Sequence, residues 1–208
     1  METEECIMTR RSKRKYMDVP VEWEKAGKIL EAGRVAPSAG NLQNWKFIVT
    51  TDKANKHKVA EACLQQWWME KAPVLITIVA EPEESTQYYG IRGERLYCIQ
   101  NCAMAAENML LMAHSQGLGA CFVAAFEEDR LKTVLGIPGP MRPQGVITIG
   151  YSDEKPPHLQ KYKLENVVYF ESFANRIKDI NATLGYTADK VQGAIKKGKE
   201  FLKGIAKK

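Results

Sequence analysis

The sequence is poor in the side chains that build metal centres and disulfide frameworks. It contains three histidines and five cysteines in 208 residues, and no two cysteines follow a Cys-x-x-Cys spacing. Cys98 and Cys102 lie four residues apart and would share one face of a helix, an arrangement that could begin a metal site. Because no further ligand lies near them in the sequence, buried free thiols are the favoured interpretation. This cysteine usage fits a reducing compartment.

Long apolar runs and the common catalytic motifs are missing as well. The longest apolar stretch, residues 72–80, is much shorter than the ~20 residues needed to span a membrane, and the acidic first residues do not resemble a signal peptide, so we expect a cytoplasmic protein. No Walker A loop, serine-hydrolase elbow or zinc-protease motif occurs, and the glycines of residues 117–119 follow an expected helix instead of opening one. With no obvious acid, base or nucleophile, the sequence favours redox chemistry carried by a bound cofactor.

Apolar periodicity indicates one domain in which helices and strands alternate. We expect helices over residues 23–35, 55–69, 94–116 and 128–135, and strands over residues 47–51, 74–79, 120–126, 145–151 and 167–170. Residues 81–90 are acidic and are expected to be irregular. The fold class is therefore α/β or α+β, and the spacing of the elements by itself would favour a parallel, doubly wound sheet.

Two short segments carry the strongest functional signal. Arg10-Arg11-Ser12-Lys13-Arg14 is a compact basic run, and arginine forks bind phosphate through charge-assisted, often bidentate bonds. Further along, residues 36–45 read Ala-Pro-Ser-Ala-Gly-Asn-Leu-Gln-Asn-Trp, a turn rich in amides and small side chains that suits the polar edge of a heteroaromatic ring. Alone, each segment is more often a solvated run or an ordinary turn, but together they suggest a phosphorylated ring cofactor.

In this order, the two segments closely resemble the nitroreductase family of flavoproteins, whose members pair an Arg-Arg-Ser-x-Arg-like run with Ala-Pro-Ser-x-x-Asn-x-Gln-x-Trp. The resemblance implies a nitroreductase-like FMN-binding domain over residues 8–170, with residues 171–208 as a basic helical extension. It also implies a three-layer sandwich, in which helices flank a mixed, mostly antiparallel sheet, and an intertwined homodimer. We follow the family here, because topology predictions from spacing alone are weak.

The resemblance further implies roles for individual residues. In the family, the first run binds the flavin, and the second segment meets it from the other subunit. A strand end passes the reactive N5 edge of the flavin, where small residues let a backbone N–H approach, and late basic residues hold the phosphate. The matching positions are Arg10, Arg11, Ser12 and Arg14 in the first run, Pro37, Ser38, Ala39, Asn41 and Gln43 in the second segment, Ala124 and Ala125 at the strand end, and Lys161 and Lys163 for the phosphate. Because the flavin does the chemistry, no catalytic side chain is assigned.

Aromatic residues between positions 67 and 97 are candidates for the wall against which a flat acceptor stacks. The four candidates are Trp67, Trp68, Tyr88 and Tyr89, and packing in the core or at the dimer interface is the alternative for each. Trp45 is expected in the core. Gln100 and Asn101 open the expected long helix, where they either reach the site or face solvent.

The implied function is an FMN-dependent oxidoreductase that takes a hydride from NADH or NADPH and reduces a nitroaromatic, quinone or similar flat acceptor in a ping-pong order. The sequence leaves open which nicotinamide and which acceptor are used. One alternative is a flavin-binding carrier or sensor without nicotinamide turnover, and another is an interaction protein that acts through its tail. No nucleic-acid partner and no metal are expected.

The net charge of +5 belongs entirely to the C-terminal tail. Residues 171–208 hold nine basic and four acidic side chains, whereas the two signs balance in residues 1–170. Residues 188–208 are expected to form a basic helix with an apolar stripe of Val191, Ile195, Gly198, Leu202 and Ile205. We favour packing of this helix on the dimer over contact with a membrane surface or an acidic partner, and its glycines leave a partly disordered tail as a further alternative.

Overall fold

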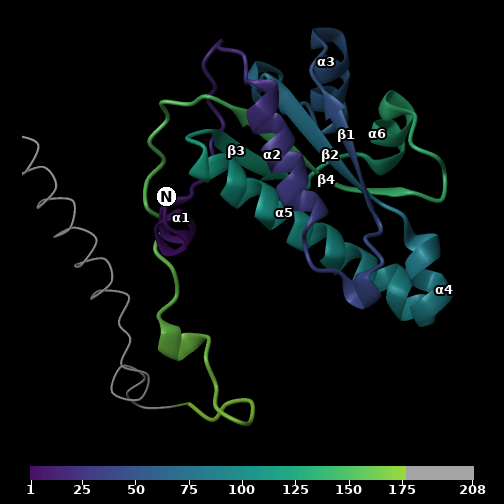
Figure 1. Cartoon of the computed structure of the whole chain (residues 1–208), viewed down its shortest axis with the longest axis vertical. Helices are drawn as coiled ribbons and strands as arrows, with labels where there is room; N and C mark the ends of the chain where they lie inside the picture. Colours follow the sequence, from purple (N-terminus) through teal and green to yellow (C-terminus); the bar gives the residue numbers. More distant parts are fainter. Residues whose placement is uncertain (177–208) are drawn as a thin grey trace, which may run out of the picture. The chain divides into compact units, whose positions relative to one another are not determined.

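The computed structural model describes residues 1–176 and divides the chain into two compact units, residues 1–156 and residues 157–208 (Figure 1). In the described part of the second unit, the chain forms a 3-10 turn, η4 (Leu164–Asn166), and no strand. The strand expected over residues 167–170 is therefore wrong: Phe170 N–H donates to Asn175 O at 2.9 Å within a local turn instead of pairing with a strand. The helix expected over residues 188–208 lies outside the described residues, and the boundary expected at residue 170 stays a prediction.

The first unit is built on a four-stranded sheet with the order β1-β2-β4-β3. The strands are β1 (Trp45–Thr50), β2 (Val74–Ala80), β3 (Gly119–Val123) and β4 (Arg142–Gly150). All three pairings are antiparallel, which confirms the family's topology and makes the parallel sheet suggested by spacing alone wrong. The only parallel pairing recorded within residues 1–176 is an isolated bridge between Ser12 and Ala120.

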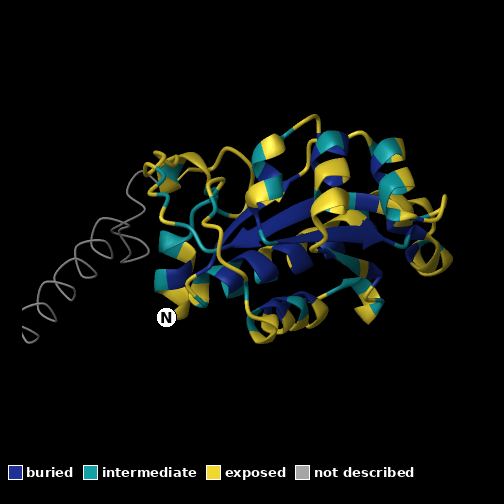
Figure 2. Ribbon diagram, turned by 90° about the horizontal axis from the view of Figure 1, so that it is seen from above, coloured by how far each residue is buried: buried dark blue, intermediate teal, exposed yellow. Residues whose placement is uncertain are grey.

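Helices cover both faces of this sheet, which confirms the three-layer sandwich (Figure 2). Helices α2 (Trp23–Arg34) and α5 (Cys98–Ser115) pack on one face, and α3 (Lys53–Ala62) and α6 (Glu128–Leu135) on the other. Successive side chains of β2 alternate between the layers: Ile76 and Ile78 enter the cluster with α2 and α5, whereas Leu75 enters the cluster with α3 and α6. Because both faces are covered, every residue of β2 is buried.

The helix expected over residues 55–69 ends earlier than predicted. Helix α3 stops at Ala62, and a separate 3-10 turn, η2 (Trp67–Lys71), follows it. Leu64 and Gln65 both take φ values of 57°, a left-handed conformation that ends an α-helix. Glycine and asparagine usually mark such a break, and neither residue occurs there, so the sequence offered no stop signal.

The expectation that residues 81–90 are irregular is wrong, because they form most of α4 (Pro82–Arg92). Pro82 occupies the first turn, where its missing N–H costs nothing, and Glu83 and Glu84 lie where the positive end of the helix dipole favours acidic side chains. Gly90 interrupts the helix with φ 56° and ψ −146°, and one π turn, η3 (Gly93–Tyr97), leads into α5. The long helix expected from residue 94 is thus confirmed from Cys98 onward.

Smaller differences concern the ends of elements. Strand β3 ends at Val123, not at residue 126, and its pairing with β4 ends at Val146. Helix α1 (Thr3–Thr9) and the short η1 turn (Ala39–Asn41) were not anticipated. All five cysteines are buried free thiols, as expected. Among residues 1–176, no helix has the length and apolarity to cross a membrane.

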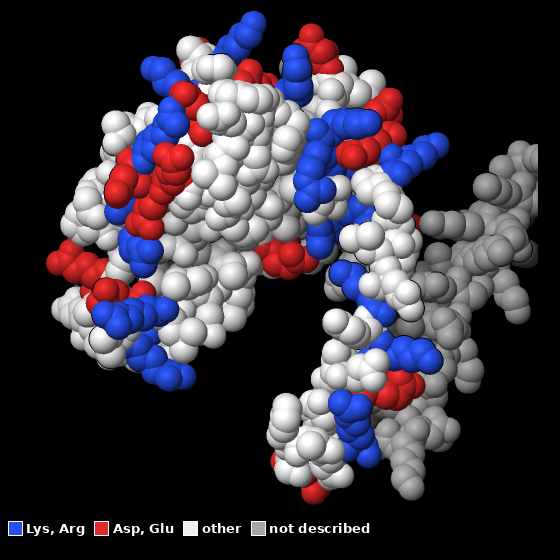
Figure 3. Space-filling view, turned by 180° about the vertical axis from the view of Figure 1, so that it is seen from behind, with Lys and Arg blue, Asp and Glu red and all other residues white. Residues whose placement is uncertain are grey.

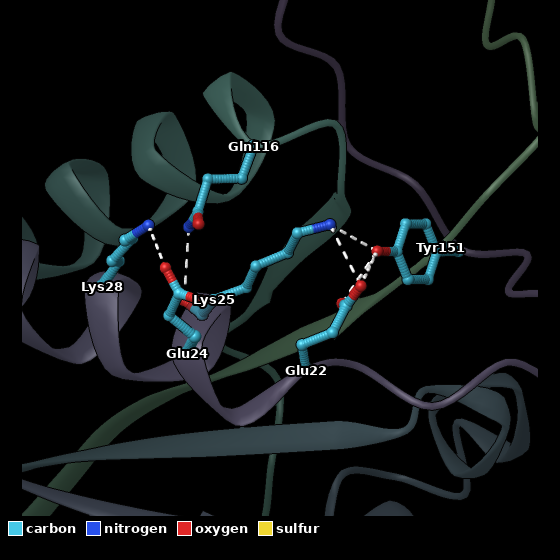
Figure 4. Close-up of polar contacts among 6 residues, drawn as sticks. All are labelled: Glu22, Glu24, Lys25, Lys28, Gln116 and Tyr151. Carbon is cyan, nitrogen blue, oxygen red and sulfur yellow. Dashed lines mark hydrogen bonds and ion pairs between the residues drawn. The ribbon is translucent and has the colours of Figure 1, made fainter.

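Polar side chains fix the start of α2 against the ends of β4 and α5 (Figure 4). The Tyr151 hydroxyl donates to the Glu22 carboxylate at 2.8 Å and accepts from Lys25 Nζ. Gln116 Nε2 donates to the Lys25 carbonyl at 3.2 Å. Exposed pairs of this kind stabilise a fold only slightly, so burial in the two clusters carries most of the stability.

On the face seen in Figure 3, charges of both signs lie around a broad uncharged surface of the first unit.

Candidate functional site

The first segment, Arg10–Arg14, is fastened to the edge of the sheet. Its backbone runs beside β3, where Ser12 forms a parallel bridge with Ala120 and Lys13 N–H donates to Ala120 O at 3.0 Å. Because β3 is the last strand of the sheet, the segment covers an edge that would otherwise leave backbone groups unpaired. Main-chain bonds therefore hold the segment, and its side chains are left to act on other groups.

The arginines of the first segment are used differently. Arg11 Nη1 donates to the carbonyls of Met8 at 2.9 Å and Arg10 at 2.6 Å, so it closes the C-terminal end of α1. Arg10 Nε lies 3.6 Å from the Glu107 carboxylate on α5. Arg14 is exposed, lies 5.9 Å above the ring of Trp68, and forms no ion pair within residues 1–176. Arg14 is thus the arginine whose guanidinium is open to an anion.

The carboxylate of Glu154, in the loop after β4, holds the chain around Arg14. Glu154 accepts from the backbone N–H groups of Arg14 at 2.6 Å and Lys15 at 3.1 Å, and its carbonyl accepts from Lys13 Nζ. Burial alone would raise the pKa of Glu154, but these N–H donors and the lysine charges lower it.

The half-buried Tyr16 donates its hydroxyl to Lys13 O at 2.6 Å, and that hydroxyl lies 2.5 Å from Thr148 Oγ1 on β4. Burial raises the pKa of Tyr16, so its hydroxyl stays protonated. Tyr16 thereby ties the first segment to the centre of the sheet as well as to its edge.

The expected strand-end residues lie in the same part of the molecule. Ala124 and Ala125 follow β3, are exposed, and have side chains small enough to leave the backbone accessible. Gln66, just before η2, donates its side-chain amide to Ala125 O at 3.3 Å. Trp68 of η2 packs against the same buried cluster as Tyr16. We call this group the first region: Arg10–Arg14, Ala124, Ala125 and Trp68.

The second segment, Pro37–Gln43, links the end of α2 to β1 and takes an unusual backbone path. Gly40, Asn41 and Gln43 have φ values of 60°, 56° and 50°. Left-handed geometry costs a non-glycine residue about 1–2 kcal/mol, although asparagine tolerates it better than most. Within the segment, the Ser38 hydroxyl oxygen accepts from Gln43 N–H at 3.0 Å, and Ser38 O accepts from Asn41 N–H at 2.9 Å.

Two buried amides hold this segment from outside. Asn101, near the start of α5, accepts from Ala39 N–H at 3.0 Å and donates to Asn44 Oδ1 at 2.7 Å. Both asparagines are buried, with 2% of Asn101 and none of Asn44 exposed. Of the two alternatives for Asn101, contact with the site segment is therefore the one observed, whereas Gln100 is exposed.

Asn44 was missed by sequence reasoning, and the only signal was an amide directly before an apolar strand. Helix α4 closes the other side of the second segment. A Cβ atom at Gly40 would lie 2.5 Å from the Tyr89 hydroxyl, and the φ value of 60° also favours glycine at this position. We call this group the second region: Pro37–Gln43, Asn44, Asn101 and Tyr89.

The four candidate aromatic residues divide between the two regions. Trp67 and Trp68 lie in η2; Trp67 is 44% exposed and stacks on His57 with ring centres 5.2 Å apart. Tyr88 and Tyr89 lie on α4; Tyr88 is 66% exposed, and Tyr89 packs edge-on against Tyr97. A single chain therefore forms no common aromatic wall from the four.

The two segments contact different parts of α5, and Arg10 of the first segment reaches Glu107 near the middle of the helix. Asn101 holds the second segment near the start of α5, whereas His114 Nε2, near its end, lies 2.9 Å from Thr9 Oγ1 beside the first segment. At a rise of ~1.5 Å per residue, these two positions are about 20 Å apart along the helix. Figure 1 shows α1 and α4 at opposite ends of α5.

The expected phosphate residues Lys161 and Lys163 are exposed and belong to the second unit.

The residues of the two regions fit a flat, phosphorylated aromatic cofactor. An open guanidinium, an accessible strand-end backbone and a turn of hydroxyl and amide groups match its phosphate, ring edge and polar atoms.

A cavity of about 320 Å³ lies elsewhere, where Cys6, Ala32 and Asn108 are among its lining residues, and none of the expected site residues lines it. Within residues 1–176, no three potential ligand side chains are grouped to hold a metal ion.

Comparison with known proteins gives a consistent result. The model of the nitroreductase family matches residues 7–71 and 65–151. A relative from Archaeoglobus fulgidus, whose name pairs NADH dehydrogenase with NAD(P)H nitroreductase, is 38% identical over 160 residues, which cover 73% of this chain and 88% of that protein. An NADH dehydrogenase of Thermus thermophilus is 30% identical over 195 residues, covering 81% and 95%. The solved structure of an FMN-dependent nitroreductase from Clostridium difficile superimposes with a TM-score of 0.71 at 29% identity, covering 82% of this chain and 100% of that one.

Proposed function

This chain belongs to the nitroreductase family, and we propose that it is an NAD(P)H-dependent flavin oxidoreductase that holds FMN and reduces flat electron acceptors such as nitroaromatics and quinones. The names of its relatives support the flavin, the nicotinamide donor and the reductase activity. The observation that carries the proposal is the first region, where Arg14, which forms no ion pair within residues 1–176, lies over Trp68, and the exposed Ala124 and Ala125 follow β3.

The first region would hold one end of the cofactor. Arg14 supplies a charge for the phosphate or for the pyrimidine edge, and Arg10 can turn from its long contact with Glu107 to do the same. Ala124 and Ala125 leave room for a backbone N–H to approach the ring. Bound FMN supplies a carrier that accepts a hydride at N5 from NADH or NADPH and passes two electrons to an acceptor, in the ping-pong order.

The second region would serve the cofactor of another copy of the chain. The second segment is held near the start of α5, whereas the first segment follows Thr9, which contacts His114 near the end of that helix, and we infer that the residues of one chain do not meet at a single site. A homodimer in which each copy lends its second segment to its partner would complete two equal sites. Ser38, Asn41 and Gln43 would then supply hydroxyl and amide groups to the ring edge, and Lys161 and Lys163 would add positive charge at the phosphate.

The same exchange would assemble the acceptor site from both pairs of aromatic residues. Trp67 and Trp68 would come from the copy that holds the cofactor, and Tyr88 and Tyr89 from the copy that lends its second segment. Aromatic faces select flat acceptors by shape instead of by specific bonds, which accounts for a broad acceptor range.

The proposal is tested by the visible spectrum of the purified protein, followed by mass identification of the released chromophore and by NADH and NADPH oxidation with a nitroaromatic acceptor. We expect about one FMN per chain and nicotinamide oxidation that depends on the acceptor, with parallel lines in double-reciprocal plots. A bound flavin that neither nicotinamide reduces would favour a carrier or sensor. A colourless protein that takes up no added FMN would overturn the proposal, and the tail would become the better lead to a function.

A further inference from the structure

We propose that Asn101, with Asn44 as its partner, is the positioning residue that sets the conformation of the second segment for flavin binding. This inference rests on the proposed function, because the segment is assigned to the flavin there. Asn101 lies outside both expected flavin-binding segments in the sequence, and 62 positions separate it from Ala39, which it contacts.

The geometry is that of a clamp across a turn. Asn101 Oδ1 accepts from Ala39 N–H at 3.0 Å, just before the left-handed residues begin, and Asn101 Nδ2 donates to Asn44 Oδ1 at 2.7 Å, just after they end. One amide thus joins both ends of residues 40–43. The exposed Asn41 and Gln43 lie between the two fixed points, so the clamp decides which way the turn presents them.

Both fixed points are themselves anchored. Asn44 O accepts from Glu81 N–H at 2.8 Å, and the next residue, Trp45, begins β1 opposite Ala80. Asn101 lies within α5, whose buried face packs on the sheet. These contacts fix the turn to both the sheet and α5. They account for its left-handed residues, because such a backbone persists only where surrounding contacts determine it.

Only an amide fulfils this role as observed, because it offers one acceptor and one donor on the same planar group. Leucine of similar size would leave the half-buried Ala39 N–H and the Oδ1 of the fully buried Asn44 without these partners. Aspartate would keep the acceptor that Ala39 uses, so it preserves one half of the clamp.

The same helix offers a matched control. Asn108, seven residues further along α5, donates its side-chain amide to Ala32 O at 3.1 Å and so joins α5 to α2 without touching either segment. Replacing Asn108 by leucine removes one amide contact from a half-buried position of the same helix. If Asn101 acts on stability alone, the FMN affinity of each variant should follow its own loss of stability.

The test compares the full-length wild type with Asn101→Leu, Asn101→Asp, Asn44→Ala and Asn108→Leu. FMN affinity is measured by flavin fluorescence on the stripped proteins, and amide hydrogen exchange is followed at residues 39–43 without flavin. We expect Asn101→Leu to bind FMN about tenfold more weakly and to exchange faster at residues 39–43. Asn44→Ala should behave similarly, Asn101→Asp should lie between Asn101→Leu and wild type, and Asn108→Leu should stay within about twofold of wild type in affinity, whatever its melting temperature.

Two results would overturn the inference alone: wild-type FMN affinity in Asn101→Leu, or equal losses in Asn101→Leu and Asn108→Leu that follow their losses of stability. A wild-type chain that takes up no FMN would overturn the proposed function itself, and the inference with it. The exchange measurement separates these cases, because it reports the clamp before any flavin is added.

Discussion

The two regions are held in place by different kinds of bond. The first segment is fastened by its backbone to the edge strand β3, which leaves the guanidinium of Arg14 open. The second segment is fastened by buried side-chain amides and by a glycine pressed against Tyr89. A segment held by main-chain bonds keeps its shape when its side chains change, whereas one held by side chains does not. Substitutions in the two regions should therefore fail in different ways.

The largest effect is expected at Gly40. Gly40→Ala places a Cβ in a left-handed residue and 2.5 Å from the Tyr89 hydroxyl, so the turn is strained and the Tyr89 side chain must move. Left-handed strain alone costs about 1–2 kcal/mol, and we expect FMN affinity to fall by about 30-fold or more in a titration of the stripped protein. Adding Tyr89→Phe removes the hydroxyl and should restore part of the affinity. No recovery in the double variant would show that the contact with Tyr89 does not matter.

A smaller and purely local loss is expected at Arg14. Arg14→Ala removes an exposed guanidinium that forms no ion pair within residues 1–176, so the melting temperature should change little. Charge-assisted bonds contribute about 1.5–3 kcal/mol, so FMN affinity should fall at least about tenfold. Lys15→Ala, one position along and also exposed, is the matched control and should bind FMN normally. Equal losses in both variants would mean that general surface charge, not this position, attracts the cofactor.

Tyr16 joins the first segment to β4, so a substitution of Tyr16 should weaken the attachment of that segment to the sheet. Tyr16→Phe removes a hydroxyl that bonds Lys13 O and Thr148 Oγ1, which should lower the free energy of unfolding by about 1–2 kcal/mol in urea titrations. Burial raises the pKa of Tyr16 in the folded protein, so the unfolded chain loses this proton first as the pH rises above ~10. Wild-type stability should therefore fall above that pH, and less steeply in Tyr16→Phe. Identical alkaline slopes in the two proteins would contradict this assignment.

The smallest effect is expected at His114. Burial and the neighbouring Arg10, Lys13 and Arg11 charges lower the pKa of His114 in the folded protein. As the pH falls below ~6.5, His114 is protonated in the unfolded chain before it is protonated in the folded one. The free energy of unfolding therefore decreases in this range. His114→Gln removes the titrating group, and its melting temperature should fall less between pH 7 and pH 5 than that of wild type. A wild-type melting temperature that rises over this range would contradict the sign.

The fold was largely readable from the sequence where local pattern decides the structure. Strand β2 and helix α6 follow from an apolar run and from an amphipathic stretch bounded by loops. Helix α4 was missed because proline and glutamates occur both in loops and in first helical turns, and the end of α3 was missed because Leu64 and Gln65 carry no break signal. These outcomes depend on tertiary contacts that a local pattern does not contain.

The site was readable in part for the same reason. Both segments are contiguous motifs, so the sequence places them on the chain. The clamp formed by Asn101 and Asn44 is not contiguous, since 57 positions separate the two asparagines and each alone is an ordinary amide. The separation of the regions along α5 likewise emerges only from the packing of that helix against the rest of the chain.

The most direct test of the account is a mixed dimer of two defective chains. Differently tagged Arg14→Ala and Asn101→Leu chains are expressed together, and dimers that carry both tags are purified and titrated with FMN. If each site combines the first region of one copy with the second region of the other, one site holds both defects and the other holds none. The account predicts that each mixed dimer binds one FMN with the affinity of a wild-type site. Either homodimer should contain two weak sites. Two equally weakened sites in the mixed dimer would contradict it, because both regions would then serve the cofactor of their own chain.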